Sequence, residues 1–136
     1  MVKQKTIKSE ISLSGVGLHT GANVTLTFCP APDNHGFKFQ RIDLPGQPII
    51  DADCDNVTDT ARGTTVTQNG ASVSTVEHVM ASLVGMDLDN VLLKLDGPEM
   101  PIMDGSSILF IEALEEVGVV AQRTDREYFS IPDRKS

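Results

Sequence analysis

The sequence predicts an α+β domain, a mostly antiparallel sheet with two helices packed on one face. Short segments that alternate apolar and polar residues occupy the first half of the chain and are typical of half-buried strands. Two segments with apolar residues at helical spacing lie in the second half. Several strands with two helices late in the order indicate this fold class.

The first three strands are predicted from alternation. Ile7, Ser9, Ile11 and Leu13 alternate with mostly polar neighbours and predict one strand. A loop with three glycines follows at 15–21, and a second strand over 24–28 is expected to return antiparallel to the first. A third strand is expected over 37–42, after turn residues at 30–34.

The middle of the chain carries turn chemistry. Residues 43–56 contain two prolines and a glycine, so we expect an irregular connection with a short extended piece at Ile49 and Ile50. Asn69 and Gly70 are flanked by two short segments, 64–67 and 71–73. This dipeptide is the strongest hairpin signal in the sequence.

The first helix is predicted to begin after Ser74, a residue type that favours the N-cap position. Glu77 follows at the spacing of a capping box, and Gly85 is expected to end the helix. Glu77 and His78 are adjacent, which brings a carboxylate and an imidazole together in the first turn. His78 lies off the apolar stripe of this helix. The stripe has the spacing i, i+3, i+4 and i+7: Val76, Val79, Met80 and Leu83.

The remaining elements are a strand, a loop and a second helix. Residues 91–95 form a short apolar strand, and two prolines keep residues 98–105 out of any helix interior. Ser106 or Ser107 is expected to cap a helix that ends at Gly118. The pattern then weakens, and residues 128–131 are either a terminal strand or the start of a connection.

Composition limits the class of protein. The chain has 136 residues, 40% of them hydrophobic, which is enough for one domain with its own core. The net charge of −8 argues against nucleic-acid or anionic-membrane surfaces, since both need positive charge. Cys29 and Cys54 form no CxxC motif, and there is no signal peptide and no transmembrane segment. We therefore expect a cytoplasmic protein without a nucleic-acid partner.

The residues that could carry chemistry leave two interpretations open. A capping-box glutamate needs no catalytic role, and a glycine loop around His19 is either a wide hairpin turn or a place where the backbone approaches a ligand. Catalytic zinc usually takes three protein ligands and keeps a fourth position for water. His78 is the one convincing ligand in the sequence. The Glu77–His78 pair is therefore either structural or part of a site completed elsewhere.

Three motifs occur in a telling order: GVGLHTG at 15–21, STVEH at 74–78 and PIMDGS at 101–106. Together they resemble the first domain of the UDP-3-O-acyl-N-acetylglucosamine deacetylases, the zinc enzymes that commit the lipid A pathway of Gram-negative bacteria. The similarity runs from about Lys3 to about Val119. The sequence also resembles the versions of this enzyme that are fused to a hydroxyacyl-carrier-protein dehydratase, although nothing of a dehydratase is present.

The resemblance implies a deacetylase N-terminal domain over 1–121, one of two similar domains of the full enzyme, with a linker over 122–136. It implies Zn²⁺ as cofactor, UDP-3-O-acyl-N-acetylglucosamine as substrate and a C-terminal deacetylase domain as partner. Glu77 matches the general base, His78 one of three zinc ligands, and His19 a histidine at the edge of the site. The inserted loop that lines the substrate near the metal is matched by Thr60, Ala61, Arg62, Gly63 and Thr64.

The family's remaining zinc ligands belong to an H-K-x-x-D motif in the second domain, and this chain has no such motif. We therefore expect the chain to be inactive alone. A carboxylate tied to the backbone as a cap cannot also take a proton, so we expect Glu77 to be the base and Ser74 to cap alone. The alternative is a non-catalytic binding or scaffold domain of the same fold. A nucleotide-binding module is weaker, since the chain has neither a P-loop nor a basic patch.

Overall fold

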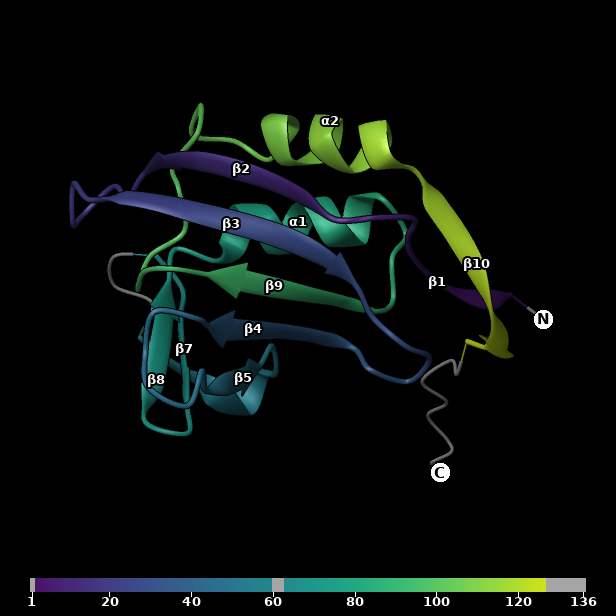
Figure 1. Cartoon of the computed structure of the whole chain (residues 1–136), viewed down its shortest axis with the longest axis horizontal. Helices are drawn as coiled ribbons and strands as arrows, with labels where there is room; N and C mark the ends of the chain where they lie inside the picture. The colour runs from purple at the N-terminus through teal and green to yellow at the C-terminus, as the bar shows by residue number, and fades with distance from the viewer. Residues whose placement is uncertain (1, 60–62, 127–136) are drawn as a thin grey trace, which may run out of the picture.

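The computed structural model of the chain describes residues 2–59 and 63–126 and confirms the α+β class. Within these residues, ten strands form three sheets, and two helices pack on the largest sheet (Figure 1). No helix in the described part of the chain is both long enough and apolar enough to cross a membrane.

The main sheet has five strands in the order β2-β3-β9-β4-β5. Its pairings are antiparallel except for β4 with β9, which run parallel from Phe37 opposite Val91 to Arg41 opposite Leu95. The expected return of the second strand antiparallel to the first is confirmed by β2 and β3. The five strands have these bounds: β2 (Ile11–Val16), β3 (Asn23–Pro30), β4 (Phe37–Arg41), β5 (Ile49–Asp51) and β9 (Val91–Leu95).

Two smaller sheets complete the strand structure. One pairs β1 (Lys3–Ile7) with β10 (Val119–Asp125), near the two ends of the chain (Figure 1). The other contains β6 (Val57–Asp59), β7 (Thr65–Gln68) and β8 (Ala71–Ser74), and a short 3₁₀ turn (Cys54–Asn56) precedes it. The predicted hairpin joins β7 to β8, and Asn69 and Gly70 both have positive φ, as a two-residue type I′ turn requires.

The helices α1 (Glu77–Gly85) and α2 (Ile108–Val117) cover the apolar face of the main sheet. Phe110 of α2 meets Phe28 of β3 edge to face, with ring centroids 6.3 Å apart. The predicted stripe of α1 contributes Val79 and Leu83, which are fully buried in the same cluster. Each helix ends where expected, α1 at Gly85 and α2 just before Gly118.

The prediction of one continuous first strand is wrong. The chain bends at 8–10, so that β1 and β2 belong to different sheets. Alternation did not reveal the break, because Ile7 and Ile11 are apolar and packed against the core on both sides of the bend. The backbone N–H of Lys8 donates to the carbonyl of Gly118 and directs β1 toward β10.

The prediction that Ser74 caps the first helix is also wrong. Ser74 is the last residue of β8, and its Oγ accepts a hydrogen bond from the hydroxyl of Thr65 at 3.0 Å. The helix begins at Glu77, after Val76, without a side-chain cap. For the second helix, Ser107 holds the cap position, and the hydroxyl of Ser106 accepts the N–H of Ile108.

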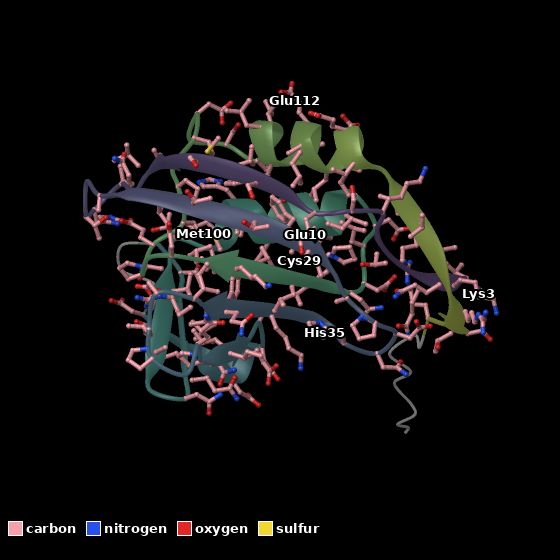
Figure 2. All side chains as sticks on the ribbon, in the orientation of Figure 1. Lys3, Glu10, Cys29, His35, Met100 and Glu112 are labelled. Atoms are coloured by element: carbon pink, nitrogen blue, oxygen red, sulfur yellow. The ribbon has the colours of Figure 1, made fainter. Side chains whose placement is uncertain are left out.

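The predicted domain boundary after residue 121 falls inside β10, which pairs with β1 as far as Asp125. Arg126 continues this attachment through ion pairs with Asp87 and Asp89, at 2.9 and 2.8 Å. The backbone N–H of Arg126 donates to the carbonyl of Val2, next to Lys3, and Figure 2 shows Lys3 at the end of the molecule away from Met100. The remainder of the predicted linker, and the alternatives for 128–131, lie outside the described residues.

Candidate functional site

The glycine loop between β2 and β3 is closed by a carboxylate from a distant part of the chain. Glu99 follows β9, and its Oε1 accepts the backbone N–H groups of His19 and Thr20, each at 3.0 Å. Its Oε2 lies 2.7 Å from Nδ1 of the His19 ring. The Glu99 side chain is 3% exposed and that of His19 is 39% exposed, so the ring lies between the buried carboxylate and solvent.

Glu99 is ionised in the fold. Burial raises the pKa of its carboxyl, but hydrogen bonds from the Thr20 and His19 N–H groups, the His19 ring and the Thr75 hydroxyl outweigh burial and lower the pKa to about 2. A buried carboxylate is stable when it accepts this many hydrogen bonds. The site therefore contains a fixed negative charge beneath the imidazole.

Gly17 allows the loop to close on that charge. A Cβ at this position would lie 2.5 Å from Oε1 of Glu99 and 2.6 Å from Oγ1 of Thr20. The backbone N–H of Gly21 donates to the carbonyl of Gly17, and Gly17 forms an isolated bridge with Pro101. The first and third motifs of the sequence are therefore in contact.

The second motif reaches the same carboxylate through Thr75. Its hydroxyl donates to Oε2 of Glu99 at 3.0 Å, and the residue is buried. Its φ is +62°, a conformation that β-branched residues rarely adopt and that costs about 1–3 kcal/mol. This turn takes the chain from the end of β8 to the start of α1, with only Val76 between Thr75 and Glu77.

Glu77 projects from the first turn of α1 and is exposed. Its Oε1 accepts the backbone N–H of Thr64 at 3.0 Å, so the carboxylate is held by the segment before β7 and not by a helix cap. Gly63 packs against it, because a Cβ on Gly63 would lie 3.2 Å from Oε2. Gly63 has a φ of +96°, where a side chain is strained whatever the space.

His78 follows Glu77 and is half-buried. Among the described residues, no group of three or more histidine, cysteine, aspartate or glutamate side chains could hold a metal ion. A zinc site with three protein ligands is therefore not assembled from the described residues alone.

A hollow of about 190 Å³ opens beside the glycine loop. It lies between this loop, the β6–β7–β8 sheet and the segment after β9, and its lining is mainly polar in residue type. The lining residues are His19, Thr20, Asp59, Thr65, Ser74, Pro98 and Glu99.

The structure brings some of the predicted site residues together. Gly63 contacts Glu77, and Glu99 and Thr75 link His19 to the turn before Glu77. Thr60, Ala61 and Arg62 lie outside the described residues. The sequence did not single out Glu99. Thr75 belongs to the STVEH motif and Thr64 to the loop matched by the resemblance, but the hydrogen bonds of these two residues were not predicted. A glutamate in a proline-containing loop has no informative spacing, and its proximity to the glycine loop arises only in the folded chain.

Comparison with known proteins places the chain in a family. The family model described as UDP-3-O-acyl N-acetylglycosamine deacetylase matches residues 4–135, nearly the whole sequence. The chain belongs to this family. The resemblance stated from the three motifs is therefore confirmed.

Curated relatives agree with this assignment. The chain is 54% identical over 98% of its length to a protein of Bacteroides thetaiotaomicron named bifunctional enzyme LpxC/FabZ, and 48% identical over 98% to one of the same name from Porphyromonas gingivalis. It is 43% identical over 96% to the UDP-3-O-acyl-N-acetylglucosamine deacetylase of Methylococcus capsulatus. The chain spans 29%, 29% and 43% of the lengths of these relatives, less than half of each.

Proposed function

We propose that this chain is the N-terminal domain of a cytoplasmic, zinc-dependent deacetylase that removes acetate from UDP-3-O-acyl-N-acetylglucosamine in lipid A biosynthesis. The chain would supply the general base and one zinc ligand, and a C-terminal deacetylase domain would supply the other ligands. The chain alone would be inactive. Because two relatives are named as bifunctional, the proposal extends to a fused dehydratase domain in the same protein.

The observation that carries the proposal is the arrangement of Glu77 beside His78 in a chain of this family. The Glu77 carboxylate is exposed, and its Oε1 accepts the backbone N–H of Thr64. Its Oε2 faces Gly63, which has no side chain to cover it. With Oε1 held by the Thr64 N–H, Oε2 remains the oxygen that can take a proton from water.

In the proposed reaction, Glu77 takes a proton from the water that attacks the carbonyl carbon of the N-acetyl group. The C–N bond then breaks, and Glu77 delivers the proton to the departing amine while acetate is released. When bound, zinc would supply a Lewis acid that polarises the amide carbonyl and lowers the pKa of water. His78 would be one of its ligands, and His19 would contact the polar part of the substrate.

The test replaces Glu77 by alanine and by glutamine in the natural protein that carries this chain. Acetate release should fall by about 10²- to 10⁴-fold in both variants, the usual contribution of a general base. Zinc content, measured by elemental analysis, should stay at the wild-type value. The free energy of unfolding should change by about 1 kcal/mol or less, because Glu77 is exposed and, within residues 2–59 and 63–126, accepts a hydrogen bond from Thr64 alone.

Two further variants complete the experiment. Glu112→Ala, on the exposed side of α2 and away from the sheet (Figure 2), should leave both acetate release and zinc content unchanged. His78→Ala should lose zinc. If Glu77→Ala loses zinc or stability as severely as activity, the assignment of Glu77 as base is wrong. If the natural protein releases no acetate, the alternative of a non-catalytic binding domain replaces the proposal.

A further inference from the structure

We propose that Glu99 is a positioning residue for His19, a role that rests on the proposed function of His19 as a substrate contact. Its buried carboxylate holds the imidazole in the form that carries a proton on Nδ1, and it thereby leaves Nε2 for the substrate. The same carboxylate fixes the turn that precedes Glu77. The Glu99 side chain therefore fixes the position of the loop that carries His19 relative to the turn that precedes Glu77.

The hydrogen bonds around Glu99 determine which ring nitrogen is protonated. An ionised carboxylate accepts hydrogen bonds and donates none, so the contact of 2.7 Å from Nδ1 to Oε2 requires a proton on Nδ1. Among the described residues, none is hydrogen-bonded to Nε2 of His19. The His19 side chain is 39% exposed, and His19 lines the hollow of about 190 Å³. In the neutral ring, Nε2 is then an acceptor for a hydroxyl or N–H group that enters this hollow.

The backbone around His19 is fixed by the same group. Oε1 and Oε2 accept the N–H of His19 at 3.0 and 3.1 Å, and Oε1 accepts the N–H of Thr20 at 3.0 Å. Both the ring and its backbone are therefore positioned, although His19 belongs to an irregular loop and lies 80 residues from Glu99 in the sequence. This type of carboxylate–imidazole pair fixes ring orientation in many functional sites.

Glu99 also stabilises the strained turn at Thr75. The Thr75 hydroxyl donates to Oε2, and Thr75 holds a φ of +62° immediately before Val76 and Glu77. The loop that carries His19 and the segment that carries the proposed base are thus bound to the two oxygens of one carboxylate. A displacement of this carboxylate would move both.

The first test measures the proton on His19 directly in this chain. Nitrogen-15 spectra of the labelled histidine rings, recorded at a pH at which the imidazoles are neutral, show which ring nitrogen carries hydrogen. His19 is assigned by the signals lost in His19→Gln. We expect the proton on Nδ1 of His19 in the wild type and a mixture of the two forms in Glu99→Gln. A wild-type His19 with its proton on Nε2 overturns the proposal, whatever the fold of the variant.

The second test uses kinetics of the natural protein with UDP-3-O-acyl-N-acetylglucosamine. Glu99→Gln should raise KM by about tenfold with a smaller change in kcat, as expected when a ground-state contact is weakened. His19→Ala should raise KM by a similar factor. Because the effect of Glu99 on KM acts through His19, the double variant should have the KM of His19→Ala alone, while any loss of kcat that arises through the Thr75 turn should remain. Multiplied effects would show independent roles and would contradict the proposal.

A matched control separates positioning from stability. Thr6 is buried in β1, and its hydroxyl donates to the carbonyl of Asn90 at 2.6 Å. β1 lies at the end of the molecule opposite the loop between β2 and β3 (Figure 1). Thr6→Val should lower the melting temperature while leaving KM and the His19 spectrum unchanged. If Thr6→Val raises KM as Glu99→Gln does, the effect is general destabilisation and the proposal fails. If the natural protein has no deacetylase activity, the proposed function fails, and the spectra still decide the role of Glu99.

Discussion

A side chain at Gly17 has no room, because its Cβ would lie within 2.6 Å of both Glu99 and Thr20. We expect Gly17→Ala to lower the free energy of unfolding by about 1–3 kcal/mol, the usual range for overpacking a filled site. Urea unfolding of the chain, followed by circular dichroism, measures this change.

Gly85 provides the control for this substitution. It is the last residue of α1, and a Cβ there would meet only Ile111 Cδ1 at 3.9 Å. Gly85→Ala should therefore be neutral or stabilising by up to about 1 kcal/mol, because alanine favours a helix more than glycine does. Equal effects at Gly17 and Gly85 would contradict the close packing of the glycine loop on Glu99.

At the level of single residues, the sequence indicated only part of the candidate site. Glu77 and His78 were singled out as candidates because they are adjacent in sequence and match a motif. Thr75 was not, because sequence rules assign positive φ to glycine and asparagine and rarely to threonine. The prediction that Ser74 is a cap failed for the related reason that the left-handed turn at Thr75 delays the helix to Glu77.

Among the elements, β10 contributes to the stability of the domain through the hydrogen bonds of its last residues. Gln122 accepts the side-chain N–H of Asn90 at 2.7 Å and donates to the carbonyl of Ala31 at 2.8 Å. A chain that ends at residue 121 loses these bonds and leaves the buried Asn90 with one fewer partner. We expect such a chain to be less stable than the full chain by about 3 kcal/mol, since several partly buried hydrogen bonds are lost. Thermal and urea unfolding measure the difference.

A chain that ends at residue 126 is the control, because it keeps β10 and the ion pairs of Arg126. It should be more stable than the chain that ends at residue 121 by about 3 kcal/mol, because it keeps the hydrogen bonds of Gln122. If the two shortened chains are equally stable, the strand pairing of residues 122–125 contributes nothing, and the domain ends at 121 as the sequence indicated.

Most elements were predictable because their own residues encode them. The strands predicted at 24–28 and 37–42 alternate regularly, and residues 91–95 are a short apolar segment. Asn69-Gly70 favours its turn whatever the rest of the chain does. β10 was missed because most of its residues are half-exposed or exposed and its second half is polar. Its extended form is imposed by β1, a partner far away in sequence.

For the molecule as a whole, Glu99 contributes stability that depends on pH. Its folded-state pKa of about 2 lies below the ordinary value of 4.5, so its ionised form stabilises the fold above that value. This contribution is lost as the pH falls from 4.5 through about 2. It is on the order of 3 kcal/mol at most, from the size of the shift. Unfolding of the chain and of Glu99→Gln should therefore differ most near pH 7 and converge toward pH 2.

Asp43 is the comparison for this experiment. Hydrogen bonds from Arg41 lower its pKa as well, but Arg41 lies only two residues away. Asp43→Asn should therefore give a smaller pH-dependent difference than Glu99→Gln. If the two variants show the same pH dependence, the carboxylate of Glu99 is not the principal acid-sensitive contact between distant segments.

The pairing of β1 with β10 also determines the order in which this domain can be completed. Lys3 and Asp125 are 122 residues apart and form both a strand pair and an ion pair. Contacts between such distant residues make folding slow, because a long loop must close before they form. During synthesis from the N-terminus, β1 is made first and finds its partner last. Until β10 emerges, the nascent domain carries an unpaired strand that is open to association with other chains.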